Sequence, residues 1–374
     1  NLPTANSVSV AATVAAGTIK LSHANAVTNG NIGQNIDNGV VFNSGIGTFN
    51  VGGLNGTAGM ALADTAAAPV QLVVGGNNSS STSFGALNGA GSLVKAGTGT
   101  LTLNGSGDFT GGTTVSAGTL AAGSAGSPGP ITPFGNGTIT VTNGSLLYLG
   151  TTVGNAFGSY QYPNSVTLNN GSLYAFDGSH RVQGNLTIAA GGGAIGSTFN
   201  APWEAFAEVD FPKALFFDGL VTGTGNLTVQ DKGDFTDNQW NTSCAVFTST
   251  GTAAQNTYSG TVTINPLTSG SSGGSYLYLM GTNVMANATI TLAGDNSPTV
   301  GRMGKPTLVF GAGNLPGPGY LTIGGLAGSG SLVLADTVVF QGGAGYSNGA
   351  PVALTVGNNN ASTTYSGVMS GAAA

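Results

Sequence analysis

The sequence predicts an all-β fold, and three observations carry that prediction. Apolar residues come in short bursts of strand length, such as TLTLNG, TITVTNG and SVTLNNG, and alternate there with threonine. This period of two places apolar side chains on one face of a strand and hydroxyl groups on the other. Asn-Gly and Gly-Gly pairs, which supply the positive φ angles of turns, separate the bursts at intervals of about ten residues.

Among all-β architectures, a solenoid of stacked strands fits this chain better than a sandwich, a barrel or a propeller. The strands are short and numerous, and the repeats are degenerate, with insertions of varying length. Outward residues are mostly Thr, Ser and Asn, which can stack at a rung spacing of about 4.8 Å without charge repulsion. The same spacing explains why charged residues make up only 5% of the chain. We therefore expect one β-solenoid over residues 1–374.

The composition argues against several classes of protein. No run approaches the roughly 18 apolar residues of a membrane-spanning helix, so no transmembrane segment is expected. A net charge of −6 without a basic stripe argues against nucleic-acid binding. One cysteine and two histidines offer no metal cluster and no catalytic triad, so we expect no cofactor and no enzymatic activity.

The clearest internal repeat pairs residues 69–89 with residues 351–371. The two segments read PVQLVVGGNNSSSTSFGALNG and PVALTVGNNNASTTYSGVMSG, and roughly half of their aligned positions are identical. Such self-similarity is typical of repeat architectures.

Residues 89–120, GAGSLVKAGTGTLTLNGSGDFTGGTTVSAGTL, resemble the autotransporter-associated β-strand repeat of bacterial autotransporter passengers. The matching positions are Gly91, Leu93, Lys95, Gly97, Gly99, Thr100, Leu101, Leu103, Phe109, Thr110, Gly111, Gly112, Thr113 and Gly118 to Leu120. The resemblance implies a right-handed parallel β-helix that is secreted and lies at the bacterial cell surface. Because the sequence starts at Asn1, we expect that a signal peptide has been removed. Lys95 is expected to be a snorkelling repeat residue.

The two ends of the sequence resemble complementary halves of one repeat. Residues 1–21 read as the tail half and residues 352–374 as the head half, and the first 19 residues carry no charge. Unpaired strand edges invite strand addition, and heterologous contacts propagate. We therefore expect a homopolymer, a head-to-tail extracellular filament. Its predicted joint residues are Val8, Val10, Val14, Ile19, Leu21, Val352, Leu354, Val356, Tyr365, Val368 and Met369.

Two segments depart from the Thr/Gly pattern and are predicted to be insertions, at about 197–218 and 230–250. Acidic residues gather there, bracketed by the two tryptophans. Trp203, Glu204 and Trp240 are candidates for glycan contact. Asp231, Asp234 and Asp237 are weak candidates for Ca²⁺ ligands.

Two alternatives to the filament stay open. The first is a monomeric adhesin-like passenger that binds surface glycans or matrix. The second, more distant one is a β-helix polysaccharide lyase or glycosidase, which would need paired carboxylates in these insertions.

Overall fold

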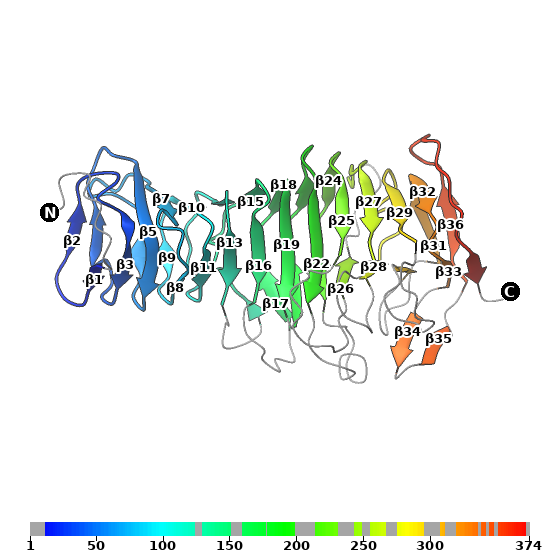
Figure 1. Cartoon of the computed structure of the whole chain (residues 1–374), viewed down its shortest axis with the longest axis horizontal. Helices are drawn as coiled ribbons and strands as arrows, with labels where there is room; N and C mark the ends of the chain where they lie inside the picture. Colours follow the sequence, from blue (N-terminus) through cyan, green and yellow to red (C-terminus); the bar gives the residue numbers. More distant parts are fainter. Residues whose placement is uncertain are drawn as a thin grey trace. The chain divides into compact units, whose positions relative to one another are not determined.

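The computed structural model describes residues 12–123, 129–150, 159–176, 178–198, 214–230, 243–248, 255–266, 275–294, 307–310, 319–335, 338–341, 344–347 and 351–371. Within these ranges the chain contains strands and turns and no helix. The largest sheet of the described strands has 20 members and the next has seven, and their ladders are parallel. The predicted all-β solenoid of parallel strands is confirmed (Figure 1).

The chain divides into two compact units, each described by itself. Unit 1 takes residues 1–152 and 162–172, and unit 2 takes residues 153–161 and 173–374. The strands of unit 1 are β1 (Ala12–Val14), β2 (Ile19–Leu21), β3 (Val27–Gln34), β4 (Val40–Phe42), β5 (Thr48–Gly56), β6 (Met60–Ala61), β7 (Gln71–Val74), β8 (Ser81–Ser83), β9 (Leu87–Asn88), β10 (Ser92–Lys95), β11 (Thr100–Leu103), β12 (Thr113–Val115), β13 (Thr119–Ala122), β14 (Gly129–Pro130), β15 (Ile139–Thr142), β16 (Leu146–Leu149) and β18 (Val166–Asn169).

Unit 2 holds the remaining strands, with β17 and β19 falling mostly within it. They are β17 (Ser159–Tyr162), β19 (Gly171–Phe176), β20 (Ser179–Val182), β21 (Leu186–Ile188), β22 (Gly193–Thr198), β23 (Leu215–Phe217), β24 (Val221–Gly223), β25 (Leu227–Val229), β26 (Ser243–Phe247), β27 (Thr261–Ile264), β28 (Ser275–Leu279), β29 (Thr289–Leu292), β30 (Thr307–Phe310), β31 (Tyr320–Ile323), β32 (Gly325–Gly328), β33 (Leu332–Leu334), β34 (Val338–Gln341), β35 (Ala344–Ser347), β36 (Ala353–Val356) and β37 (Met369–Gly371). Strands β34 and β35 form an antiparallel hairpin.

Stacking in register explains how short strands build a core. Strand β10 lies between β7 and β12, so that Leu93 is paired with Leu72 on one side and with Thr113 on the other. In β10 and β11 every second residue is buried, as the sequence alternation predicts. Leu93 therefore stacks on Leu72 on the inner face of the sheet, which forms the wall of the solenoid. Outward threonines such as Thr102 are half-buried.

Three strands of unit 2 are buried on both faces. Every residue of β23, β26 and β28 is buried, and these strands pair with one another in the seven-stranded sheet. Continuous apolar runs such as LFF and SCAVF are typical of strands covered on both sides. The structure thus places residues 215–217 and 243–247, which the sequence assigned to insertions, in strands of the wall. Residues 199–213 and 231–242 lie outside the described part of the chain.

Candidate functional site

Lys95 has an unusual place for a lysine in the best-defined repeat of the chain. It is the last residue of β10, and only 1% of its surface is exposed. Its Nζ donates to Ala96 O at 2.5 Å, Gly97 O at 2.8 Å and Ala117 O at 3.2 Å. Burial lowers the pKa of Lys95 to about 8, so the ammonium group is still charged at neutral pH.

The contacts of Lys95 correct one expectation from the sequence. The predicted snorkelling is wrong, because the ammonium group ends at backbone carbonyls rather than in water. Three carbonyls of two successive turns, after β10 and after β12, converge on one donor and are satisfied together. Gly97 in this corner has φ +66°, and a Cβ there would meet Gly75 O at 2.0 Å. Lys95 therefore links neighbouring turns (coils) of the solenoid by hydrogen bonds, and Gly97 allows neighbouring coils to approach closely.

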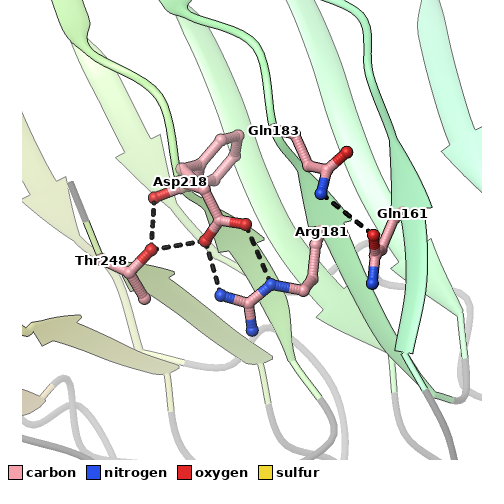
Figure 2. Close-up of polar contacts among 6 residues, drawn as sticks. Gln161, Arg181, Gln183, Asp218 and Thr248 are labelled. Carbon is pink, nitrogen blue, oxygen red and sulfur yellow. Dashed lines mark hydrogen bonds and ion pairs between the residues drawn. The ribbon is translucent and has the colours of Figure 1, made fainter. Parts of the chain in front are cut away.

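A polar cluster on the outward face of unit 2 is the strongest candidate for a contact surface. Figure 2 shows Arg181 of β20 close to Asp218, which follows β23, and to Thr248, which follows β26, with Gln161 and Gln183 beside them. Arg181 Nε and Nη2 donate to the two carboxylate oxygens of Asp218, at 2.9 and 2.6 Å. This is the one ion pair among the residues that the structure describes.

The backbone register explains why this ion pair forms. Arg181 is opposite Phe216 in the β20–β23 ladder, and its guanidinium carbon lies 4.5 Å from the centre of the Phe216 ring. Asp218 follows β23 directly, on the same face as Phe216, because successive side chains alternate between faces. Arg181 and Asp218 have side chains that are 22% and 25% exposed, so this face of the sheet points outward.

Thr248 adds a hydrogen bond to the ion pair, and a pair of glutamines lies beside it. Thr248 Oγ1 lies 2.5 Å from Asp218 Oδ1 and 3.2 Å from Phe217 O, so its hydroxyl proton has an acceptor in either direction. Gln183 Nε2 donates to Gln161 Oε1 at 3.0 Å. A carboxylate held by a guanidinium and a hydroxyl is suited to binding and orientation rather than to proton transfer. Among the described residues, no group of three or more His, Cys, Asp or Glu could hold a metal ion.

Beside the polar cluster, the outward face of the same sheet is apolar. Phe216, Cys244 and Tyr276 belong to a buried cluster, with Ala214, Val246, Tyr278 and Val309 as its other members. Burial raises the pKa of the Cys244 thiol well above its usual range. The inward face carries its own aromatic stack, with the rings of Phe217 and Phe247 centred 4.9 Å apart.

His180 lies on the inward face of β20 and is buried. Its Nε2 is 3.1 Å from Phe176 O, and its ring stacks on Tyr160 at 5.2 Å. Burial lowers its pKa to about 4, so the ring is neutral at physiological pH. An inward, neutral imidazole of this kind supports packing of the core.

Several residues singled out from the sequence lie outside the described ranges. They are Val8, Val10, Trp203, Glu204, Asp231, Asp234, Asp237 and Trp240. The glycan and Ca²⁺ sites assigned to them therefore stay predictions.

The other predicted joint residues fall on or beside strands near the two ends of the described chain. Val14 in β1, Leu21 in β2 and Val352 just before β36 are buried. Ile19 in β2, Leu354 in β36 and Tyr365 are partly buried. Val356, Val368 and Met369 are exposed. Apolar side chains are therefore exposed to solvent at Val356, Val368 and Met369, in the C-terminal part of the predicted joint. The joint itself remains a prediction.

The sequence did not reveal the Arg181–Asp218 pair, because the two residues are 37 positions apart. The available signal was rarity: Arg181 is one of seven basic residues in 374. In the ranges that the structure covers, no helix is long and apolar enough to cross a membrane.

Comparisons with known proteins agree with the repeat found in β10 to β13. A family model, the passenger-associated-transport-repeat, matches residues 93–122. The chain is also 30% identical over 178 residues to an adhesin, the BmaC autotransporter of Brucella suis biovar 1. That match covers 47% of this chain and 4% of the adhesin, so the chain spans a small part of this relative. No solved structure matches significantly. In its repeat and its fold, this chain is similar to the passengers of autotransporters.

Proposed function

We propose that this chain is a section of an adhesin-type passenger that acts outside the cell as a non-enzymatic binding protein. The observation that carries the proposal is the passenger-associated repeat at residues 93–122, whose strands form fully stacked coils of the solenoid. The likeness to an autotransporter adhesin supports the same function and a location at the cell surface. The described charged groups also support a scaffold role. For example, Asp64 accepts backbone hydrogen bonds within its own turn, and Asp37 accepts one from Gly59 N.

The polar cluster on unit 2 is the surface that we propose for ligand contact. Gln161, Gln183, Arg181 and Asp218 present amide, guanidinium and carboxylate groups in fixed positions on one face. Sugar hydroxyls can both donate to carboxylates and accept from amides, so a surface glycan fits this chemistry. A matrix protein is the second ligand to be tested.

The test is adhesion of beads that carry the purified chain to surfaces coated with glycans, matrix protein or albumin. We expect retention on a glycan or matrix coating above the albumin level. Gln161→Ala combined with Gln183→Ala should reduce retention, whereas Ile36→Ala, which changes an exposed residue of unit 1, should not. Retention equal to that of albumin on every coating would contradict the proposal.

A second candidate function is the head-to-tail fibre expected from the sequence. It is supported by one observation: β36 and β37 each pair with a single described strand, β31 and β33 respectively. Edge strands of this kind can accept a strand from another molecule. Sedimentation over a hundredfold range of concentration, followed by electron microscopy, tests this candidate. Fibres that lengthen with concentration would support it, and monomers throughout would reject it.

The enzyme alternative has a direct assay as well. We expect no release of reducing or unsaturated sugars from polysaccharides incubated with the chain. Release that is lost on changing Asp231 or Asp234 to Asn would replace the binding function with a catalytic one.

A further inference from the structure

Two stretches of the chain, residues 47–89 and 319–371, have the same backbone pairing although they lie in different units. In the first stretch β7 pairs with β5, so that Leu72 is opposite Phe49. In the second, β36 pairs with β31, so that Leu354 is opposite Leu321. Leu354 is the counterpart of Leu72 in the sequence repeat.

The turns of the two stretches also correspond. Ala63 bridges Pro69 in the first, and Ala335 bridges Pro351 in the second, both antiparallel. Asn78 and Asn360 both have positive φ angles, of 59° and 56°. Their backbone N–H groups donate to Gly75 O and Gly357 O, at 3.0 Å in each case. Apart from the β34–β35 hairpin, the described parts of the two stretches thus share their strand pairing as well as their sequence pattern.

The copies differ in what lies on their far side. In the first, β10 and β11 of the passenger-associated repeat cover β7 and β8. In the second, β36 is the counterpart of β7 and β37 is the counterpart of β9, and neither has a pairing on that side from any strand that the structure describes. Val74 is 0% exposed, whereas its counterpart Val356 is 42% exposed. Leu87 is 3% exposed, whereas its counterpart Met369 is 48% exposed.

In the first copy, three acceptors form hydrogen bonds with the coil that covers it, and the second copy has equivalent acceptors. Val74 O accepts from Ala96 N at 2.8 Å, Asn78 Oδ1 from Thr98 N at 3.0 Å, and Ser80 Oγ from Thr100 N at 3.1 Å. The equivalent residues are Val356, Asn360 and Ser362, so both side-chain acceptors keep their identity. All three are exposed. Residues 351–371 also lack any charged side chain that would discourage strand addition.

We infer that residues 352–371 form an acceptor surface for a coil of the passenger-associated repeat type. The occupant is a segment equivalent to Ser92–Leu103, paired in parallel as that segment pairs with the first copy. Its equivalents of Leu93 and Lys95 would lie opposite Leu354 and Val356. Its backbone N–H groups would reach Val356 O and the Asn360 and Ser362 side chains. This inference concerns assembly of the solenoid and does not depend on adhesion, so either can fail alone.

The test joins residues 90–123 of this chain directly after Gly371 and follows a cysteine placed in the acceptor surface. Met369→Cys should react readily with a maleimide in the chain without the added coil. With the coil, the rate should fall at least about tenfold, because the side chain becomes buried as Leu87 is. The native Cys244 is buried and gives the slow background.

Two further variants make the result specific. Val356→Lys in the joined protein places a charge opposite the added lysine equivalent to Lys95, and should restore fast labelling. Ile36→Lys, at an exposed position of unit 1, should leave the labelling slow. The inference is overturned if Met369→Cys is labelled at the same rate in three samples: the chain alone, the chain with the added coil, and the chain mixed with an excess of free 90–123 peptide. Slow labelling of the original chain that speeds up on dilution also overturns it, because a second copy would then be the occupant.

Discussion

The passenger-associated repeat of unit 1 and the strands β23, β26 and β28 of unit 2 form two different kinds of sheet, called walls here. In β11 the inward Leu101 and Leu103 are buried, and the outward Thr100 and Thr102 are half-buried. In β26 and β28 the outward residues Cys244 and Tyr276 are buried as well. A one-sided wall needs only hydroxyl side chains outside. A two-sided wall carries large apolar groups on both faces and gains correspondingly more from burial.

The largest effect should come from the outward face of the two-sided wall. Phe216→Ala removes a fully buried ring and the partner of the Arg181 guanidinium. We expect a loss of about 3–5 kcal/mol of unfolding free energy, as for other buried aromatics. Thr102→Ala, at an outward position of the one-sided wall, should cost below about 0.5 kcal/mol. Urea unfolding followed by circular dichroism measures both, and similar costs for the two variants would abolish the distinction.

The next largest effect is expected at Lys95, the long polar side chain that is buried in β10 of the one-sided wall. Lys95→Met keeps the aliphatic length but leaves three carbonyls without their donor. We expect a loss of about 1–3 kcal/mol at pH 7, the usual cost of unsatisfied buried groups. Lys20→Met in β2 is the matched control and should cost less. A higher unfolding free energy in Lys95→Met would show that the buried ammonium group destabilises the fold rather than stabilising it.

The same lysine gives a pH dependence with a defined sign. Burial lowers the pKa of Lys95 from 10.5 to about 8. Between these values the unfolded chain binds more protons than the folded chain, so stability contributed by Lys95 rises with pH from about 8 to 10.5. The difference in unfolding free energy between the wild-type chain and Lys95→Met should therefore widen from about pH 7 to about pH 10. A constant or shrinking difference would mean that the folded pKa is not depressed.

The smallest effect is expected at the polar cluster. The carboxylate of Asp218 is held by a half-buried ion pair, and such pairs contribute at most about 1 kcal/mol. Asp218→Asn should cost no more than this, and the cost should decrease in high salt. Gln183→Ala beside it should show no salt dependence. A large loss that is insensitive to salt would place the pair in the core rather than on a surface.

The sequence predicted the one-sided wall better than the two-sided one, for a physical reason. Alternation of leucine and threonine in TLTL specifies which face is buried, so β10, β11 and their stacking could be anticipated. In LFF and SCAVF both faces are apolar, so the alternation disappears. These runs then look like departures from the repeat, although they are strands of the wall.

The candidate surface was harder to predict than the fold. The Arg181–Asp218 pair depends on the register of β20 and β23, which are separated by residues 183–214. Lys95 was recognised as a repeat residue, but its burial depends on carbonyls from two turns that only the stacked structure brings together. The duplication of residues 69–89, in contrast, was visible directly in the sequence.

Cysteine labelling tests directly whether the wall is one-sided in the repeat and two-sided in strands β23, β26 and β28. Thr102→Cys is made in a Cys244→Ala background and compared with the wild-type chain, in which Cys244 reports on β26. We predict that the thiol introduced in β11 reacts with a maleimide under native conditions, whereas Cys244 reacts only when the chain unfolds. Equal reactivity of the two sites in the folded protein would show that the outward faces of β11 and β26 are equally accessible.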